Sequence, residues 1–408
     1  MNKIITSALL LISMTGFAQT AFVANYADNS VSVINVATNT SITTVTVGAH
    51  PDGVSVSPDG TKVYVANYGS TTVNRINIAT NTVADTITVG NIPYGLAVSP
   101  DNTKVYVANY GDNTVSVISS PIDTVIATIH VGVEPVGVAV SPDGSKVYVT
   151  NWTDGTVSVI NAAADTVSNT ITVGSDPSGI CVSPSGAKVY VVNRSSGTVS
   201  VINTATNLVS ATINVGSVPN GVCISPDGTK LYVVNSVGWT VSVINTANNA
   251  ILATIAVGGH PFGISITPDG TKVYVADYNS DSVSVINTAT NTVSATFGVG
   301  VGPYSFGNFI TNYPTNTGIA NLGNETGKVI VYPNPFSTST TLFINDIRTD
   351  SNTYLYIYDS IGKEVKRVQI GTTKRITFSR EHLSVGKYFY KIISGKNDII
   401  GTGKMVIE

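Results

Sequence analysis

Apolar and polar residues alternate along most of this chain in short segments that recur every 42 residues. One repeat contains four such segments, at residues 95–99, 104–109, 114–119 and 124–131. Alternation with a period of two is typical of half-buried β-strands. Turn-forming runs separate the segments: Ser-Pro-Asp-Gly or a variant after the first, and Asn-Thr-Ala-Thr-Asn or a variant after the third. Each repeat therefore predicts one antiparallel, four-stranded sheet.

Two markers fix the register of the repeats. The aromatic anchor of the second strand stands at Phe22, Tyr64, Tyr106, Tyr148, Tyr190, Tyr232 and Tyr274. A Pro-x-Gly triplet begins at Pro51, Pro93, Pro135, Pro177, Pro219 and Pro261, and a seventh copy at Pro303 has Ser305 in place of Gly. Repeats of this length bury their apolar faces against their neighbours. We therefore predict an all-β chain with a seven-bladed β-propeller of four-stranded blades, and a sandwich is the alternative.

The ends of the array predict how the ring closes. The first repeat begins at residues 21–25, which match a second strand with no first strand before it. The last repeat ends at residues 303–310, which match a first strand with no second strand after it. Pairing of these two segments would complete the seventh blade and leave no unpaired edge.

The repeat resembles a known family. The sequence VYVANYG at residues 63–69 and the sequence SVSVINTATNTV at 282–293 are similar to the YVTN family of β-propeller repeats. The resemblance extends from residue 21 to about residue 311. It implies that the first strand of each blade lines a central channel. It also implies that the second-to-third and fourth-to-first loops share one face of the propeller.

Charge divides the chain into two parts. Only 11% of the residues are charged, and the net charge is −8 over residues 19–311 but +5 over residues 326–408. An acidic repeat region argues against nucleic acid as a partner, and the change of sign indicates a domain boundary. Cys181 and Cys223 occupy one repeat position that is otherwise filled by small residues, so we expect free structural thiols.

The sequences outside the repeats predict export. Residues 1–18 have a basic start, an apolar run and a small-x-small site, which together indicate a signal peptide. No other apolar run is long enough for a membrane span, so we expect no transmembrane segment in the mature chain. Residues 19–311 form the predicted propeller, residues 312–327 a linker, and residues 328–408 a small β-sandwich.

The C-terminal region resembles the type A sorting domain of the type IX secretion pathway. The matching motifs are YPNPF at 332–336, IYDSIGKEV at 357–365, LSVGKYFYKI at 383–392 and the terminal GKMVIE. The resemblance implies that residues 328–408 engage the type IX machinery of a Bacteroidetes-type bacterium, and that the protein is secreted or held at the cell surface. An accessory domain that binds sugar is the alternative.

Differences between the repeats indicate where a ligand would bind. The turns of one face change little, and the lysines beside them (Lys62, Lys104, Lys146, Lys188, Lys230 and Lys272) predict a solvated rim. The loops of the other face vary. The candidates for ligand binding are Tyr26, Tyr68, Tyr110, Trp152, Arg194 and Tyr278 after the second strand, and Asp52, Tyr94, Glu134, Asp176, Asn220, Phe262 and Tyr304 around Pro-x-Gly. Aromatic and polar residues together suit a sugar or a protein surface, although the rings could instead pack between blades.

Signals for an enzyme are few. His50 and His260 occupy equivalent positions and could hold a metal with Asp52 and Glu134. The chain contains no haem-attachment, nucleophile-elbow or phosphate-loop motif, and we expect no cofactor. The sequence therefore favours a secreted or surface propeller that binds a glycan or protein. A lactonase-like or other hydrolytic propeller with a metal at the channel mouth is the first alternative, and a structural component of the cell envelope is the second.

Overall fold

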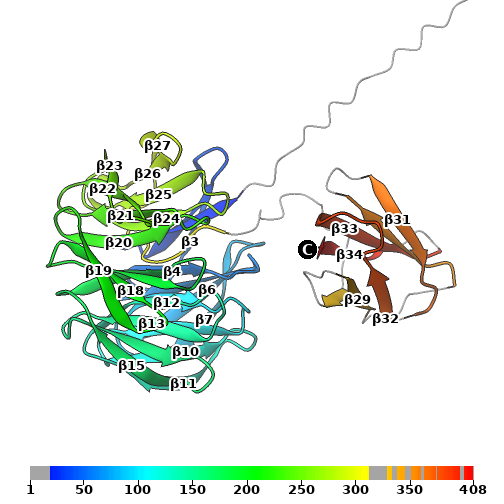
Figure 1. Cartoon of the computed structure of the whole chain (residues 1–408), viewed down its shortest axis with the longest axis horizontal. Helices are drawn as coiled ribbons and strands as arrows, with labels where there is room; N and C mark the ends of the chain where they lie inside the picture. Colours follow the sequence, from blue (N-terminus) through cyan, green and yellow to red (C-terminus); the bar gives the residue numbers. More distant parts are fainter. Residues whose placement is uncertain are drawn as a thin grey trace, which may run out of the picture. The chain divides into compact units, whose positions relative to one another are not determined.

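The protein consists of two compact units, Met1–Thr317 and Gly318–Glu408. The computed structural model, shown in Figure 1, describes residues 19–311, 329–332, 338–344, 351–359, 363–373, 375–395 and 399–407. The predicted signal peptide and linker lie outside these residues. Within the described part of the chain there is no helix with the length and hydrophobicity needed to cross a bilayer.

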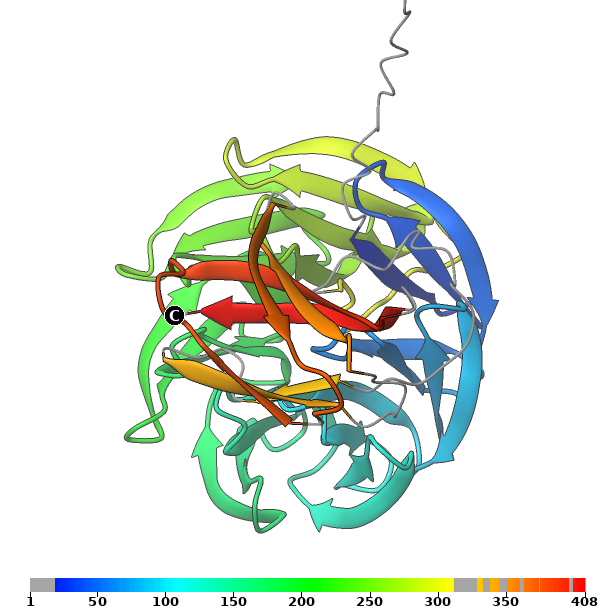
Figure 2. The same ribbon diagram turned by 90° about the vertical axis from the view of Figure 1, so that its right-hand side faces the viewer.

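The first unit contains six four-stranded antiparallel sheets and one three-stranded sheet, each paired in chain order. Figure 2 shows the sheets arranged around a common axis, as the blades of a propeller. The innermost strands are β4 (Pro51–Val56), β8 (Pro93–Val98), β12 (Pro135–Val140), β16 (Pro177–Val182), β20 (Pro219–Ile224) and β24 (Pro261–Ile266). Successive innermost strands contact one another, so they line the central channel as predicted.

The remaining strands of the blades follow the predicted register. The second strands are β1 (Thr20–Asn25), β5 (Lys62–Asn67), β9 (Lys104–Asn109), β13 (Lys146–Asn151), β17 (Lys188–Asn193), β21 (Lys230–Asn235) and β25 (Lys272–Asp277). The third strands are β2 (Ser30–Asn35), β6 (Thr72–Asn77), β10 (Thr114–Ser119), β14 (Thr156–Asn161), β18 (Thr198–Asn203), β22 (Thr240–Asn245) and β26 (Ser282–Asn287). The outer strands are β3 (Thr40–Thr46), β7 (Thr82–Thr88), β11 (Thr124–His130), β15 (Thr166–Thr172), β19 (Leu208–Asn214), β23 (Ile251–Ala256) and β27 (Thr292–Gly298). A 3₁₀ turn, η1 (Tyr278–Ser280), follows β25.

The apolar core lies between blades. Tyr64 and Val73 of one blade pack with Leu96, Val105 and Ile118 of the next, and all five side chains are almost fully buried. Equivalent clusters of aromatic and β-branched residues join the following pairs of blades. The alternation seen in the sequence therefore places one apolar face of each sheet against the next sheet.

The Gly of Pro-x-Gly is required by the approach of neighbouring innermost strands. A Cβ atom on Gly95 would lie 2.3 Å from the carbonyl oxygen of Val136 in the next blade. The same contact would be 2.1 Å for Gly53 against Tyr94 and 2.3 Å for Gly137 against Ser178. Only glycine, which has no Cβ, permits backbones to lie this close.

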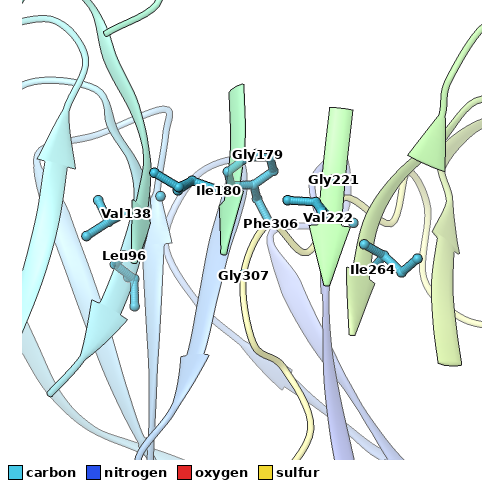
Figure 3. A pocket seen from close by; sticks show the side chains of 11 residues that line it. Leu96, Val138, Gly179, Ile180, Gly221, Val222, Ile264, Phe306 and Gly307 are labelled. Carbon is cyan, nitrogen blue, oxygen red and sulfur yellow. The ribbon is translucent and has the colours of Figure 1, made fainter. Parts of the chain in front are cut away.

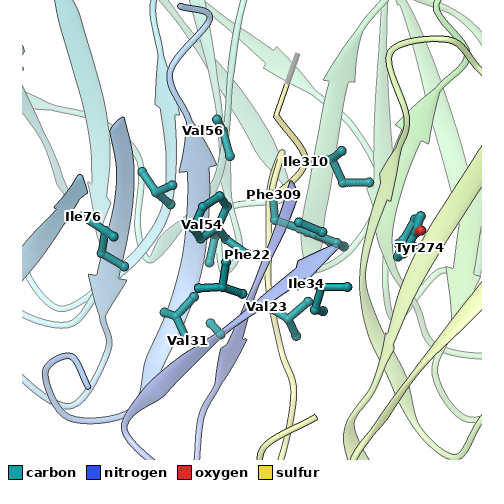
Figure 4. Packing of buried hydrophobic residues seen from close by; sticks show 14 of the residues in the cluster. Phe22, Val23, Val31, Ile34, Val54, Val56, Ile76, Tyr274, Phe309 and Ile310 are labelled. Carbon is teal, nitrogen blue, oxygen red and sulfur yellow. The ribbon is translucent and has the colours of Figure 1, made fainter. Parts of the chain in front are cut away.

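The first and last segments of the repeat array close the ring, with one departure from the prediction. Phe22 donates its N–H to the carbonyl of Phe309 at 2.8 Å, and Tyr304 donates to Ala24 at 2.9 Å. Phe309 and Ile310 complete the apolar cluster around Phe22, as Figure 4 shows. The segment 303–310 nevertheless pairs through isolated bridges rather than as a regular strand. Ser305 (φ 51°) and Gly307 (φ 122°) interrupt its extended backbone.

The lysines beside the Ser-Pro-Asp-Gly turns are not a solvated rim, and this prediction was wrong. Each amino group donates a hydrogen bond to a backbone carbonyl of the next blade. The bonds run from Lys62 to Ser120, from Lys104 to Ala162 (2.8 Å), from Lys146 to Thr204 (3.1 Å), from Lys188 to Thr246 (3.1 Å), from Lys230 to Thr288 (2.7 Å) and from Lys272 to Val36 (3.0 Å). A periodic lysine thus acts as a clamp between blades, because its acceptor recurs with the same period.

The second unit is a two-sheet β-sandwich. One sheet has the order β28 (Val329–Tyr332), β29 (Ser339–Ile344), β32 (Arg375–Ser379). The other has the order β31 (Glu364–Gln369), β30 (Tyr354–Tyr358), β33 (Gly386–Ile393), β34 (Ile399–Ile407). Side chains from both sheets share one core cluster, as the alternating sequence predicts for a small sandwich.

Candidate functional site at the loop face of the propeller

A recurring backbone hydrogen bond brings the two variable positions of each repeat together. The residue after the second strand donates its N–H to the carbonyl of the residue before the proline. Tyr68 donates to His50 at 3.0 Å, and Trp152 donates to Glu134 at 2.9 Å. The residue before the proline has a positive φ, for example 51° at His50. We call the face built from these paired loops the loop face.

Most of the predicted candidates form one aromatic cluster at the channel mouth on the loop face. Its members are His50, His260, Tyr26, Tyr68, Tyr94, Tyr110, Tyr278, Tyr304, Phe262 and Phe306, connected by ring contacts of 4.1–6.5 Å between centroids. Phe262 stacks on Tyr304 at 4.1 Å, and His50 stacks on Tyr26 at 4.6 Å. The tyrosine rings keep part of their surface exposed. Packing between blades and presentation to solvent therefore occur in the same residues.

Four of these tyrosines form a closed ring of contacts, which we call the tyrosine box. Tyr26 lies 6.1 Å from Tyr68, Tyr68 lies 5.6 Å from Tyr94, Tyr94 lies 6.4 Å from Tyr304, and Tyr304 lies 5.9 Å from Tyr26. A hydrogen bond of 3.0 Å joins the hydroxyls of Tyr94 and Tyr304. Burial is the largest cause that raises the pKa of each of the four hydroxyls, and the nearby charge of Asp52 is a further cause in all four.

Asp52 is the buried acid of this mouth. It occupies the middle position of Pro-x-Gly in β4, is only 1% exposed, and its Oδ1 has no hydrogen-bond partner within the described structure. Burial raises the pKa of its carboxyl well above the ordinary value. An acid of this kind is stable only when it is protonated or when a cation lies beside it.

The charged and indole side chains among the other predicted residues belong to the blades of β12–β15 and β16–β19, and Glu134 forms a side-chain hydrogen bond with Tyr110 of the cluster. The guanidinium carbon of Arg194 lies 5.3 Å from the centre of the Trp152 ring, a cation–π contact. The carboxylate of Glu134 accepts a hydrogen bond from Thr153, and that of Asp176 accepts one from Ser195. These residues form a second, more polar patch.

Asn220 is buried at the same repeat position as Asp52, and its backbone carbonyl accepts a hydrogen bond from Ser178 at 3.2 Å. Sequence reasoning did not select Ser178 or Phe306, although both lie in the mouth. Ser178 could have been found from its middle position in Pro-x-Gly. Phe306 holds the repeat position of Leu96 and Ile264, so it could have been found as the aromatic exception at a position that is otherwise aliphatic.

The two histidines do not gather further ligands. His50 packs on Tyr26 with its Nδ1 3.2 Å from the Tyr26 carbonyl, whereas His260 packs on Phe262 and Tyr278. Burial lowers the pKa of His260. Across the residues that the structure describes, no group of three His, Cys, Asp or Glu residues could hold a metal. The metal site at His50 and His260 remains a prediction without a third ligand among those residues.

The channel beneath the mouth is apolar. Leu96, Val138, Ile180, Val222, Ile264 and Phe306 narrow it, as Figure 3 shows. Beyond this waist, towards the Ser-Pro-Asp-Gly turns, it widens to a cavity of about 380 Å³ lined largely by aliphatic side chains. Cys181 and Cys223 line this cavity as free thiols, as predicted, and burial raises the pKa of both.

Comparison with known proteins agrees with this architecture. A model of the YNCE-like beta-propeller matches residues 3–115 and 223–309, and a model of the 7-bladed beta-propeller lactonases matches residues 122–226. A model of the secretion system C-terminal sorting domain matches residues 330–408. The chain is a β-propeller with a type IX sorting domain. Its sorting domain directs export to the cell surface or the extracellular space.

Solved structures share the fold of this propeller protein. Hydrazine synthase of Kuenenia stuttgartiensis aligns with a TM-score of 0.62 and 24% identity, over 70% of this chain and 99% of the other. A functionally unknown protein from Desulfotomaculum acetoxidans aligns with a TM-score of 0.63 and 18% identity, over 72% and 98%. No curated protein matches the chain. At these identities the likeness concerns the fold alone.

Proposed function

We propose that this exported propeller is a non-enzymatic binding protein whose loop face holds an extracellular glycan or protein. The observation that carries the proposal is the gathering of ten aromatic or histidine rings at one end of the channel. Tyr, Trp and Arg dominate the energetic centres of binding interfaces, since each combines a large apolar surface with a polar group.

The arrangement of the face supports binding over structural packing alone. Packing would need apolar rings sealed from solvent, whereas Tyr68, Tyr110 and Trp152 remain partly exposed. The polar patch of Arg194, Glu134 and Asp176 adjoins them and offers charged hydrogen-bonding groups. A scaffold that repeats with little change elsewhere varies here, as loops with binding roles do.

The lactonase-like alternative gains less support. The matching part of the lactonase model covers residues 122–226, and both candidate metal ligands, His50 and His260, lie outside that range. Elemental analysis of the purified protein separates the alternatives. A stoichiometric divalent ion that is lost in His50→Ala and His260→Ala variants would favour the enzyme.

The test of the proposal is binding to glycan and protein arrays by the full chain and by a Tyr68→Ala/Tyr110→Ala/Trp152→Ala variant. We expect the variant to lose at least tenfold in affinity for the ligand found, because single interface aromatics often contribute more than 1 kcal/mol each. The matched control removes exposed apolar residues away from the loop face, Ile42→Ala/Ile122→Ala/Leu208→Ala, and should bind like the wild type. Equal affinity of the two triple variants would contradict the proposal.

A further inference from the structure

We infer that the tyrosine box, with Asp52, is a binding site for an organic ammonium group, such as a lysine side chain, an amino sugar or choline. The inference rests on the proposed function, since it names the ligand chemistry that the loop face would take. It depends on three features of the mouth: the ring of four tyrosines, the buried acid, and the access from solvent.

The four rings of the tyrosine box lie close enough together for one cation to interact with all of them. The four contacts of the box join Tyr26, Tyr68, Tyr94 and Tyr304 into a closed ring with sides of 5.6–6.4 Å. A cation at the middle of such a ring lies within the ~6 Å of each ring centroid at which cation–π attraction is significant. Aromatic boxes recognise alkylammonium groups in this way, because the ring faces carry negative charge density and the methyl or methylene groups fit apolar walls.

Asp52 supplies the charge that a box of tyrosines lacks. None of the ion pairs among the described residues includes Asp52, and its Oδ1 is buried without a partner. Asp52 lies beside the box, because its backbone carbonyl accepts a hydrogen bond from Phe306 at 3.1 Å and the ring of Phe306 contacts that of Tyr94 at 5.7 Å. A bound ammonium would pair with the free oxygen and stabilise the charged carboxylate over the protonated acid that burial favours.

The box is accessible from outside while its acid is not. Each of the four tyrosines is partly exposed, whereas Asp52 is 1% exposed. A charged group that enters between the rings therefore meets the carboxylate only after it has lost part of its water. Recognition of a cation in a partly dehydrated site is stronger than on an open surface.

The repeat itself provides variants that the scaffold tolerates. Ser178 occupies the position of Asp52 in another blade, and Ser236 occupies the position of Tyr68. Asp52→Asn and Asp52→Ser therefore remove the charge with a residue that fits. Tyr68→Phe keeps the ring, and Tyr68→Ser removes it. Trp239→Asn is the matched control, because Trp239 is an exposed aromatic residue in a loop of the same face, is not among the predicted binding residues, and has Asn113 at its repeat position in another blade.

The experiment is calorimetric titration of the full chain with choline, Nα-acetyl-lysine methylamide and glucosamine. The uncharged probe is 3,3-dimethyl-1-butanol, which has the shape of choline. We expect at least one ammonium probe to bind, the uncharged probe to bind at least tenfold more weakly, and Asp52→Asn and Asp52→Ser to lose at least tenfold. Tyr68→Ser should also lose binding, while Tyr68→Phe and Trp239→Asn should bind within about twofold of the wild type.

Which probe binds best identifies the source of the ammonium group: a protein, an amino sugar or a quaternary amine. Failure of every ammonium probe to bind the wild type, or equal binding by wild type and Asp52→Asn, overturns the inference. The proposed function is tested separately by the arrays. A ligand found there whose affinity depends on Tyr110 or Trp152 but not on Asp52 would retain that function and reject the ammonium site.

Discussion

The two ends of the propeller contain aspartates whose carboxyl pKa values are shifted in opposite directions. On the face of the Ser-Pro-Asp-Gly turns, Asp143 accepts hydrogen bonds from Ser141 and Ser145, which lower the pKa of its carboxyl to about 2. Asp227 is held in the same way by Ser225 and Thr229, and its pKa is also lowered. On the loop face, burial raises the pKa of Asp52 well above the ordinary value and that of Asp277 to about 6.

The difference follows from the number of donors that each face offers. A turn supplies backbone N–H groups and hydroxyls around an exposed carboxylate, so the charged form is favoured. The loop face encloses Asp52 and Asp277 among rings and strand ends, where too few donors reach them, although its exposed acid Asp112 accepts hydrogen bonds from Asn91 and has a lowered pKa. The acids of the Ser-Pro-Asp-Gly turns are therefore satisfied, whereas Asp52 and Asp277 on the loop face each keep a buried oxygen without a hydrogen-bond partner among the described residues. The following predictions test that contrast, from the largest effect to the smallest.

Substitution of the glycine in Pro-x-Gly, which varies little among the repeats, should lower the free energy of unfolding more than any other change considered. Gly95→Ala would place a Cβ 2.3 Å from the Val136 carbonyl oxygen and push two innermost strands apart. We expect a loss of about 3 kcal/mol in the free energy of unfolding, at the upper end for an overpacked site. Urea unfolding followed by tryptophan fluorescence measures the loss in the propeller alone, because Trp152 and Trp239 are the two tryptophans of the chain.

Gly238→Ala is the control for this change. Its new Cβ would lie 3.4 Å from the Thr240 hydroxyl, an ordinary contact, on the same face. Its stability should remain within about 1 kcal/mol of the wild type. Similar losses in the two variants would mean that the Gly of Pro-x-Gly has no special role in the approach of the strands.

Asp277 allows one buried acid to be exchanged for the residue that the other blades use. Asn stands at this position in six blades, for example Asn235, which donates from its side chain to Ser242 at 3.0 Å. Asp277 is fully buried, and its Oδ1 has no hydrogen-bond partner among the described residues. We expect Asp277→Asn to raise the free energy of unfolding at pH 7 by about 2–3 kcal/mol, since each unit of pKa shift corresponds to about 1.4 kcal/mol.

The effect of Asp277 on the free energy of unfolding depends on pH. The folded pKa of about 6 lies above the unfolded value, so the folded state holds the proton more tightly. The contribution of Asp277 is therefore most favourable below about pH 4 and is lost as the pH rises to 6. Urea unfolding at pH 4 and pH 7 should show the gain of Asp277→Asn only at the higher pH. A gain that is equal at both values would assign the effect to something other than the charge.

Much of the difference between the two faces could be predicted from the sequence. The turns of one face change little among the repeats, whereas the loops of the other face vary. The period of the repeat predicts the strands, and the differences among the copies indicate Tyr26, Tyr68, Tyr94 and Tyr304 as candidates for binding. Pairings between blades could not be read in this way. The hydrogen bonds of the lysines could not be predicted, because their acceptors are backbone carbonyls 58 residues away and every residue has such a carbonyl.

One contact between blades does have a signal in the sequence, because both of its residues depart from the repeat. Arg75 replaces a valine of the other blades, and Asp123 lies in Ser-Ser-Pro-Ile-Asp, the turn that departs most from Asn-Thr-Ala-Thr-Asn. The structure joins them in an ion pair of 2.7 Å across two blades. Two irregularities in neighbouring repeats had the same cause. The closing segment 303–310 shows the opposite limit, because the strain at Ser305 arises from ring closure and not from local sequence.

The smallest expected effect compares a hydrogen-bonded tyrosine hydroxyl with an unpartnered one on the face of the Ser-Pro-Asp-Gly turns. The hydroxyl of Tyr274 donates to the Val36 carbonyl at 3.0 Å and to Asn39 at 2.6 Å, whereas the buried hydroxyl of Tyr232 has no partner within the described structure. Tyr274→Phe should therefore cost about 1 kcal/mol, and Tyr232→Phe should be neutral or slightly stabilising. Phe22 already occupies this repeat position, so the ring without its hydroxyl fits the site. Urea unfolding monitored by fluorescence compares the two variants directly. If both lose the same stability, the hydroxyls act through packing, and the contrast between satisfied and unsatisfied polar groups would have to be restricted to the acids.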